Sequence, residues 1–258
     1  KLNHAAAKST WQDQLWLGLL ANRFAELGDR RPEAFGQSID IDSPDTLGYC
    51  VLGPLVLDYL SWVARSSLSE SCEQILFLSR EGHALHRAFK TFKPFSTKLD
   101  GVADAYFLTS RRASGMASLS DSNGLLGLFG GTFNGTMQEL LAARMGHDAA
   151  KLAKSLLGDE SIAKHVFLPE MPQAVTVMVA AIEEPLLELA RTEREAYLAY
   201  WSRTVNPGPI AVCDLGYAGT IQSNLSRMTG RPLTGKYFAL DKRAADRPLH
   251  GGSASARF

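Results

Sequence analysis

Four short apolar runs, separated by segments of helical length, constrain the fold more than any other feature of the chain. They are QILFLS (74–79), DAYFLTS (104–110), PIAVCDL (209–215) and TGKYFAL (234–240). A run that is apolar throughout is typical of a strand buried on both faces. The first two runs are separated by HALHRAFKTF and the last two by TIQSNLSRMTG, both with helical periodicity. Such strand–helix–strand units favour parallel pairing with right-handed crossovers, so we expect an α/β fold with a Rossmann-like parallel sheet.

The segment between the second and third runs has a different character. Residues 116–205 are expected to form a helical insertion or cap, ending in a long helix over 174–205 that is kinked before Pro185. The glycine-rich NGLLGLFGGTFNG (123–135) is interpreted as a hinge or a loop over the site. We therefore divide the chain into a Rossmann-like core with N-terminal helices, 1–115 and 206–258, and the insertion, 116–205.

Two helices are expected before the first strand. Their periodicity places them at about 9–27 and 45–66. The second contains Gly53-Pro54, which should kink it or split it in two. Its many large apolar side chains favour packing on the sheet over a free helix in water.

Composition excludes several classes of protein. Lys plus Arg and Asp plus Glu both number 27, and this balance argues against a general nucleic-acid surface. The three cysteines form no CxxC motif or zinc-type spacing, so we expect no metal site and a reducing, cytoplasmic location. No basic region precedes an apolar core near the first residues, so no signal peptide is expected. Pro54, Asp58 and Glu183-Glu184 interrupt the apolar stretches, which predicts no membrane span.

Polar clusters follow three of the expected strands. Because the carboxyl ends of parallel strands share one edge of the sheet, where ligands bind in open α/β folds, the clusters should converge on one cleft under the insertion. The clusters are Ser79-Arg80-Glu81-Gly82-His83, Thr109-Ser110-Arg111-Arg112 and Asp214-Leu215-Gly216-Tyr217-Ala218-Gly219-Thr220.

The third cluster is either a plain strand-to-helix turn or a phosphate site. Gly216 and Gly219 permit a sharp turn, and a helix starting near Thr220 would direct backbone N–H groups at an anion. Thr220 itself would donate its hydroxyl to the ligand or cap the helix. Arg80, Arg111 and Arg112 favour the phosphate interpretation, because guanidinium groups match phosphate oxygens in a bidentate manner.

Other residues of the clusters are candidates for proton transfer or substrate contact. Glu81, His83 and Asp214 are the candidate catalytic groups, although Glu81 is alternatively the partner of a nearby arginine. Asp214 would otherwise hold a metal, a sugar hydroxyl or an arginine. His86 is interpreted as a surface or packing residue. The remaining candidates for phosphate or substrate binding are Ser79, Gly82, Ser110 and Tyr217.

Five segments in a fixed order resemble a known group of proteins. They are LGYCVLGPLVLDYLSWV, ILFLSREGHALHRAF, YFLTSRRAS, VCDLGYAGTIQSNL and GKYFAL. The set resembles the C-terminal region of large bacterial proteins that are classed with the haloacid-dehalogenase (HAD)-like hydrolases and associated with surface-polysaccharide biosynthesis. The resemblance covers roughly 47–115 and 209–240, and it implies a Rossmann-like module that works on glycan precursors.

This chain departs from the family pattern at three points. The hydrolase Asp-x-Asp motif of the family lies in a separate N-terminal segment, and DIDSPDT (40–46) follows no apolar strand, so aspartyl phosphatase activity is not carried over. The family usually has Arg-Asp-Gly where this chain has Arg80-Glu81-Gly82. It commonly has Trp at the position of Tyr217.

Two functions from different classes remain open. The first is an enzyme, a transferase or hydrolase acting on a phosphorylated or nucleotide-activated sugar. A phosphoribosyltransferase-like arrangement is a variant of it, although one aspartate is few for the acidic loop of that fold. The second is a non-catalytic module that binds a glycan precursor or a partner enzyme in a biosynthetic complex, favoured by the lack of a complete nucleophile–base–orienter set. The sequence identifies no cofactor.

Overall fold

The computed structural model describes residues 18–19, 21–22, 25, 41 and 43–258. The helix expected at 9–27 therefore lies largely outside the described residues. Everything below concerns the described part of the chain.

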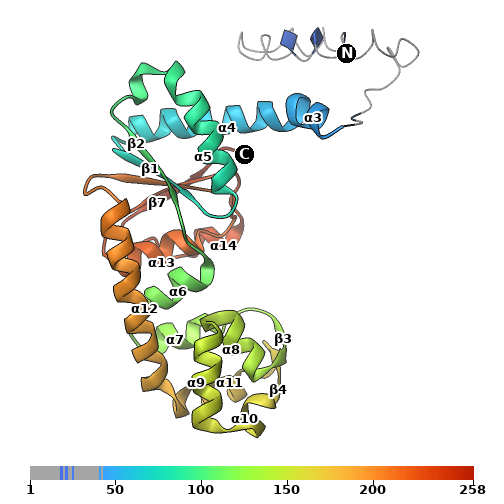
Figure 1. Ribbon diagram of the computed structural model, residues 1–258, viewed down its shortest axis with the longest axis vertical. Coiled ribbons are helices and arrows are strands. Elements are labelled where there is room, and N and C mark those ends of the chain that lie inside the picture. The colour runs from blue at the N-terminus through green and yellow to red at the C-terminus, as the bar shows by residue number, and fades with distance from the viewer. Residues whose placement is uncertain (1–17, 20, 23–24, 26–40, 42) are drawn as a thin grey trace. The chain divides into compact units, whose positions relative to one another are not determined.

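A five-stranded parallel sheet forms the centre of the fold (Figure 1). Its order is β2-β1-β5-β6-β7. The strands are β1 (Gln74–Leu78), β2 (Ala103–Phe107), β5 (Ile210–Asp214), β6 (Thr234–Tyr237) and β7 (Ser253–Ala256). The predicted α/β, Rossmann-like parallel sheet is confirmed, with strand ends one to three residues shorter than the apolar runs.

The order in which the chain adds strands to the sheet reverses at β1, while all strands remain parallel. It runs from β1 to β2 on one side of β1 and then crosses back to β5 on the other side. Gln74 lies opposite Ala103 in β2 and opposite Ile210 in β5, so β1 has a parallel neighbour on each side. Such a reversal leaves a crevice outside the carboxyl ends of the two strands, where ligands bind in open α/β sheets.

The strand side chains alternate between two covered faces. Phe77 packs against Phe89 of α5 (Gly82–Phe92), with ring centroids 5.1 Å apart. On the other face, the buried Leu76 and Val212 share an apolar core with side chains of α12 (Glu183–Thr204) and α13 (Thr220–Thr229). Figure 1 shows α5 on one face of the sheet and α12 and α13 on the other. Burial on both faces explains why the two central runs, at β1 and β5, are almost wholly apolar.

The segment between β2 and β5 has a core of its own. Buried side chains from Met116 to Ala190 form a separate apolar cluster. The elements here are α6 (Arg111–Ala117), α7 (Ser122–Leu128), β3 (Phe133–Thr136), α8 (Met137–Met145), α9 (His147–Leu157), α10 (Asp159–Ala163), β4 (His165–Leu168), α11 (Pro172–Ala181) and α12. The glycine-rich stretch 123–135, interpreted above as a hinge or loop, lies mainly in α7 and β3.

Two features of this segment differ from the expectation. β3 and β4 form an antiparallel pair, which the purely helical interpretation missed. Each has only four residues, too few to show a clear period of two. The long helix over 174–205 is two helices, α11 and α12, divided at Ile182. Pro185 thus lies in the first turn of α12, where its missing N–H costs no helical hydrogen bond.

The helix expected at 45–66 is longer than its pattern indicated. It runs from Pro44 to Ser69 as α3 (Pro44–Leu47), a π-helical turn (Gly48–Leu52) and α4 (Gly53–Ser69). Gly53 N–H donates to the oxygen of Gly48, five residues back. We attribute the wider turn to Pro54, which follows it and has no N–H for the regular ladder. Of the two expected effects of Gly53-Pro54, a kink or a split, the split does not occur, and the helix instead departs from regular α geometry just before this pair.

This helix is also the one stretch among the described residues that is long and apolar enough to cross a membrane by length and composition. Its best 18-residue window has a mean hydropathy of 1.4, and 28% of that window is buried. Tyr59, Leu60 and Val63 are buried, whereas Leu52 and Leu55 are exposed. A core helix of a soluble protein meets the same criteria, so the absence of a membrane span stays a prediction.

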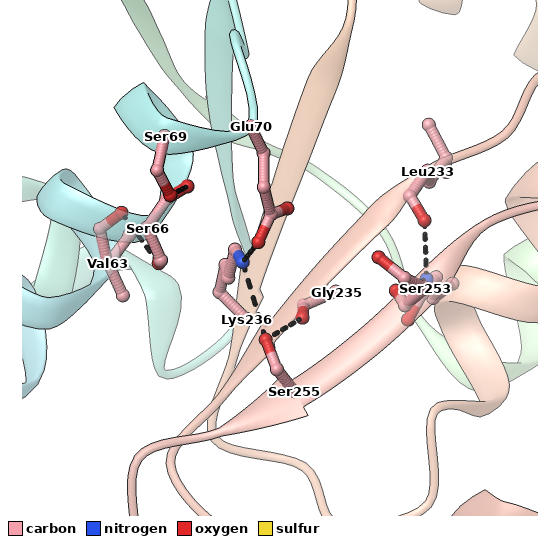
Figure 2. A network of polar contacts seen from close by, with 10 residues as sticks. Val63, Ser66, Ser69, Glu70, Leu233, Gly235, Lys236, Ser253 and Ser255 are labelled. Atoms are coloured by element: carbon pink, nitrogen blue, oxygen red, sulfur yellow. Dashed lines mark hydrogen bonds and ion pairs between the residues drawn. The ribbon is translucent and has the colours of Figure 1, made fainter.

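A buried lysine connects β6 to its surroundings (Figure 2). The side chain of Lys236 is 1% exposed, and its Nζ donates to Glu70 Oε1 at 2.5 Å and to Ser255 Oγ at 3.3 Å. Glu70 follows α4, and Ser255 is the register partner of Lys236 in β7. Burying an ammonium is costly unless it is paired and hydrogen-bonded. These contacts therefore join α4, β6 and β7.

We expect Glu70→Ala to lower the free energy of unfolding by about 1–3 kcal/mol, because it deprives a buried ammonium of its charged partner. Lys236→Met, which removes the charge together with the need for a partner, should cost less. Urea unfolding of both variants measures the difference, with the exposed Glu160→Ala as a control. A smaller loss in Glu70→Ala than in Lys236→Met would contradict this account.

Candidate functional site

Three loops meet at the reversal of strand order. They follow β1, β2 and β5 at the carboxyl edge of the sheet. The charges of Glu81 and Arg111 both act on the carboxyl group of Asp214. One charged side chain from each loop therefore lies within electrostatic range of a common point.

Within the loop after β1, Ser79 holds the neighbouring loop in place. Ser79 N–H donates to the oxygen of Phe107 at 3.0 Å, and its Oγ donates to the oxygen of Thr109 at 2.6 Å. The same Oγ accepts from Thr109 N–H at 2.9 Å. The peptide between Ser79 and Arg80 is cis. Ser79 thus joins the loops after β1 and β2, and its hydroxyl is engaged inside the protein.

Gly82 allows α5 to start directly over the end of β1. A Cβ at this position would lie 2.7 Å from the carbonyl carbon and 2.9 Å from the oxygen of Phe77. Backbone cannot yield to such a contact, so a side chain here would displace the helix. Gly82 therefore has a packing role that is independent of any ligand.

Arg80 and Glu81 are the exposed groups of this loop. Their side chains are 92% and 47% exposed, and Arg80 Nη2 lies 3.3 Å from Glu81 Oε1. The pairing of Glu81 with an arginine, named above as the alternative to catalysis, is thus present. An ion pair this exposed stabilises the fold little, so both groups are available to a ligand.

The two histidines of α5 have different surroundings. His83 is exposed and contacts Tyr106 edge to face, with ring centroids 5.4 Å apart. His86 Nε2 lies 2.8 Å from Asp104 Oδ2, and Lys93 Nζ lies 2.7 Å from Asp104 Oδ1. Burial disfavours the charge of Asp104, but the hydrogen bonds from Lys93 and His86 outweigh burial and lower the pKa of this carboxyl. His86 is therefore a packing residue of the fold.

Arg111 and Arg112, the first two residues of α6, have different surroundings. Ser110 caps α6 by accepting from Ala113 N–H at 3.0 Å. Arg111 is exposed, and its charge acts on Asp214. Arg112 instead donates from Nη1 to both carboxylate oxygens of Glu193, at 3.1 and 3.2 Å, and to the oxygen of Met145. Arg112 ties α6 to α8 and α12 and is not oriented as a ligand group.

Two tyrosines of α12 fix the start of the same loop. Tyr200 Oη accepts from Leu108 N–H at 2.8 Å, and Tyr197 Oη donates to the oxygen of Leu108 at 3.3 Å. Burial raises the pKa of Tyr197 to about 12. Both rings also pack against Phe107. These tyrosines therefore pack against the sheet with their rings and hold the backbone of Leu108 with their hydroxyl groups.

The loop after β5 is a tight turn shaped by its two glycines. Asp214 Oδ1 accepts from Gly216 N–H at 3.0 Å, and a Cβ on Gly216 would lie 2.7 Å from Asp214 Oδ2. Gly219 has φ of 64°, a conformation that favours glycine, and is the N-cap of α13. Thr220 is the first residue of α13 and makes no cap hydrogen bond.

Asp214 is a half-buried carboxyl with an altered proton affinity. Burial raises its pKa and the hydrogen bond from Gly216 opposes the rise. The charge of Glu81 adds to the rise, and that of Arg111 acts against it. A carboxyl group tuned by burial and by specific neighbours in a cleft is a common property of acid–base sites.

A fourth segment reaches this turn, and the sequence interpretation missed it. Asp241 N–H donates to the oxygen of Tyr217 at 2.9 Å, and Arg247 Nε donates to the oxygen of Ala218 at 2.7 Å. Both donors follow β6, whose carboxyl end lies at the same edge as the other three. The polar stretch DKRAADRPLH (241–250) was the available signal.

Metal ligands show no clustering in the described part of the chain. No group of three or more His, Cys, Asp or Glu side chains is placed there to hold an ion. None of Cys50, Cys72 and Cys213 forms a disulfide, and all three are buried.

Asp214→Asn should stabilise the chain at neutral pH. The folded pKa of Asp214 lies above the unfolded value of about 3.9. Once the pH exceeds the folded pKa, the carboxyl group is charged in both states, and its charge lowers the free energy of unfolding. The amide keeps an acceptor for Gly216 N–H but carries no charge. The free energy of unfolding of the variant should therefore exceed that of the parent at pH 7, and the difference should vanish near pH 3.

Urea unfolding at both pH values measures this effect, with the exposed Asp246→Asn as a matched control. A variant less stable than the parent at pH 7 would contradict the account.

No family model matches the chain, and no curated protein matches it significantly. The geometry of the loops is therefore the basis for assigning a function.

Proposed function

We propose that the chain binds a phosphorylated or nucleotide-activated sugar outside the carboxyl ends of β1 and β5, and acts on it as a transferase or hydrolase. One observation carries the proposal: the loops that bear Glu81, Arg111 and Asp214 follow three adjacent parallel strands at one edge of the sheet, and the charges of Glu81 and Arg111 act on the carboxyl group of Asp214. A cation beside a carboxyl of raised pKa suits a substrate that needs both anion binding and proton transfer.

The residues have separate tasks in this proposal. Arg111 binds phosphate oxygens, and the exposed Arg80 is free to add a second guanidinium. Asp214, held by Gly216, donates a proton to the leaving oxygen, because a raised pKa favours its protonated form. Glu81, the more exposed carboxyl, accepts the proton of the attacking hydroxyl or water. Tyr217, with a 55% exposed side chain, offers a ring face for the sugar.

The biological setting belongs to the proposal as well. The five ordered segments resemble those of HAD-like proteins associated with bacterial surface polysaccharides, which supports a glycan precursor as the substrate class. Such precursors are built in the cytoplasm, and we place the protein there.

A non-catalytic binding module is the second candidate, and one observation favours it. Ser79 and Arg112, both predicted to contact substrate, are engaged inside the protein. A site with fewer free polar groups suffices for binding a glycan precursor or a partner enzyme. Stabilisation by a ligand without turnover would favour this candidate.

A thermal-shift screen against sugar phosphates and nucleotide-diphosphate sugars tests the proposal. We expect at least one compound to raise the melting temperature, with turnover of that compound followed by chromatography. Arg111→Ala should abolish the shift, whereas Arg87→Ala, an exposed arginine of α5, should preserve it. If no compound shifts the parent chain, or if Arg111→Ala responds as the parent does, the proposal is wrong.

Ligand binding should also be accompanied by proton uptake. The positive charge of Arg111 lowers the pKa of Asp214 and so works against the rise caused by burial. An anion bound to Arg111 offsets that positive charge, so the pKa of Asp214 should rise further when the ligand binds. Titration calorimetry in buffers of different ionisation enthalpy measures the protons taken up near pH 5. Uptake should be lost in Asp214→Asn, and equal uptake in parent and variant would remove Asp214 from this role.

A further inference from the structure

The segment after β6 contacts the turn that follows β5 (residues 214–220). It lies on the other side of this turn from the loop that bears Arg111, because β6 and β2 are on opposite sides of β5 in the sheet. It comprises α14 (Lys242–Ala245) and the connection to β7. Two hydrogen bonds described above, from Asp241 N–H and Arg247 Nε, hold consecutive carbonyl oxygens of the turn. The turn is thus fixed by a segment that sequence reasoning had not connected with the site.

Arg247 is positioned closely against the turn. Its Cδ lies 3.9 Å from where a Cβ of Gly219 would stand, and Tyr237 Oη lies 3.7 Å from the same point. The Nε bond to Ala218 fixes the plane of the guanidinium. Among the described residues, its two Nη groups have no hydrogen-bond partner. Arg247 therefore presents unused donors beside the turn, on a side chain that is only partly exposed.

The charges of Arg247 and Asp214 both act on the phenol of Tyr237. Burial raises the pKa of the Tyr237 phenol, the charge of Asp214 adds to the rise, and the charge of Arg247 opposes it. Tyr237 Oη donates to Gln222 Oε1 at 2.9 Å and is fixed below the turn. The charges of Asp214 and Arg247 thus both act on a phenol that its hydrogen bond to Gln222 holds in place.

We infer that Arg247 is a second anion-binding residue of the site, so that a phosphate group of the ligand is bound between Arg111 and Arg247. The inference rests on the proposed function and extends it, because two guanidiniums from opposite loops suit a diphosphate better than a monophosphate. A nucleotide-diphosphate sugar is then the substrate class, in preference to a simple sugar phosphate.

Titration calorimetry with inorganic pyrophosphate and inorganic phosphate tests the inference. The parent chain should bind pyrophosphate more tightly than phosphate, and Arg247→Ala should weaken pyrophosphate binding by about 10- to 100-fold. Lys242→Ala is the matched control, since it removes one exposed cation from the same segment. It should bind as the parent does.

Two measurements separate ligand contact from support of the turn. Methylguanidinium should partly restore pyrophosphate affinity to Arg247→Ala, which a misfolded turn would not allow. Arg247→Lys keeps the charge without the planar fork, and should lose severalfold in affinity with an unchanged melting temperature.

Each outcome separates this inference from the function on which it rests. Equal pyrophosphate affinity in parent and Arg247→Ala, or an equal loss in Lys242→Ala, would overturn the role of Arg247 and leave that of Arg111 intact. The same holds if the parent binds a sugar phosphate in the thermal-shift screen but does not bind pyrophosphate. If the parent binds neither pyrophosphate nor any compound of the screen, both are wrong. A loss in Arg247→Ala but not in Arg111→Ala would overturn the binding of a phosphate group between the two arginines, because Arg111 would then take no part in it.

Discussion

The hydrogen bonding of β1 to parallel neighbours on both sides is the constraint on which the site depends. It makes β1 an interior strand, so Leu76 and Phe77 must be apolar on opposite faces. It also places the end of β1 next to the ends of β2 and β5, which arrive from opposite directions along the chain. Glu81 and Asp214, 133 residues apart in sequence (214 − 81), are brought together by this order alone. Another strand order would keep every helix and strand but separate these two carboxyl groups.

The sequence predicts those parts of the fold that are buried on both faces. The runs at β1 and β5 are apolar because helices cover both sides, and a buried strand leaves a clear pattern. β7 (Ser253–Ala256) has the sequence SASA and lies at the edge of the sheet. Small residues show no hydrophobic period, and this strand is held by pairing with β6 and by Ser255 beside Lys236. Its position depends on contacts between distant residues, which no local pattern contains.

The meeting of the three loops at one edge of the sheet was predictable from the sequence, whereas the orientation of their side chains was not. The ends of parallel strands share an edge whatever the details of their loops. Neighbouring residues of a helix, however, point about 100° apart. Arg111 and Arg112 look equivalent in sequence, yet one charge acts on Asp214 and the other side chain binds Glu193. Which arginine acts on Asp214 depends on where α6 begins, and the cap at Ser110 determines that.

Three ionisable side chains buried around the sheet show how a structural charge differs from a functional one. Lys236 donates to Glu70 and Ser255, which compensate its burial. The carboxyl of Asp104 is bonded by His86 and Lys93, and its pKa is lowered, so its charge is favoured by the fold. In Asp214, by contrast, burial outweighs the hydrogen bonds and charges that oppose it, and the pKa is raised. Folding therefore favours the charge of Asp104 and works against that of Asp214. Carboxyl groups with raised pKa values are common at acid–base sites, and Asp214 lies at the reversal of strand order, where the charges of Glu81 and Arg111 act on it. These two features support the role proposed for Asp214 in proton transfer.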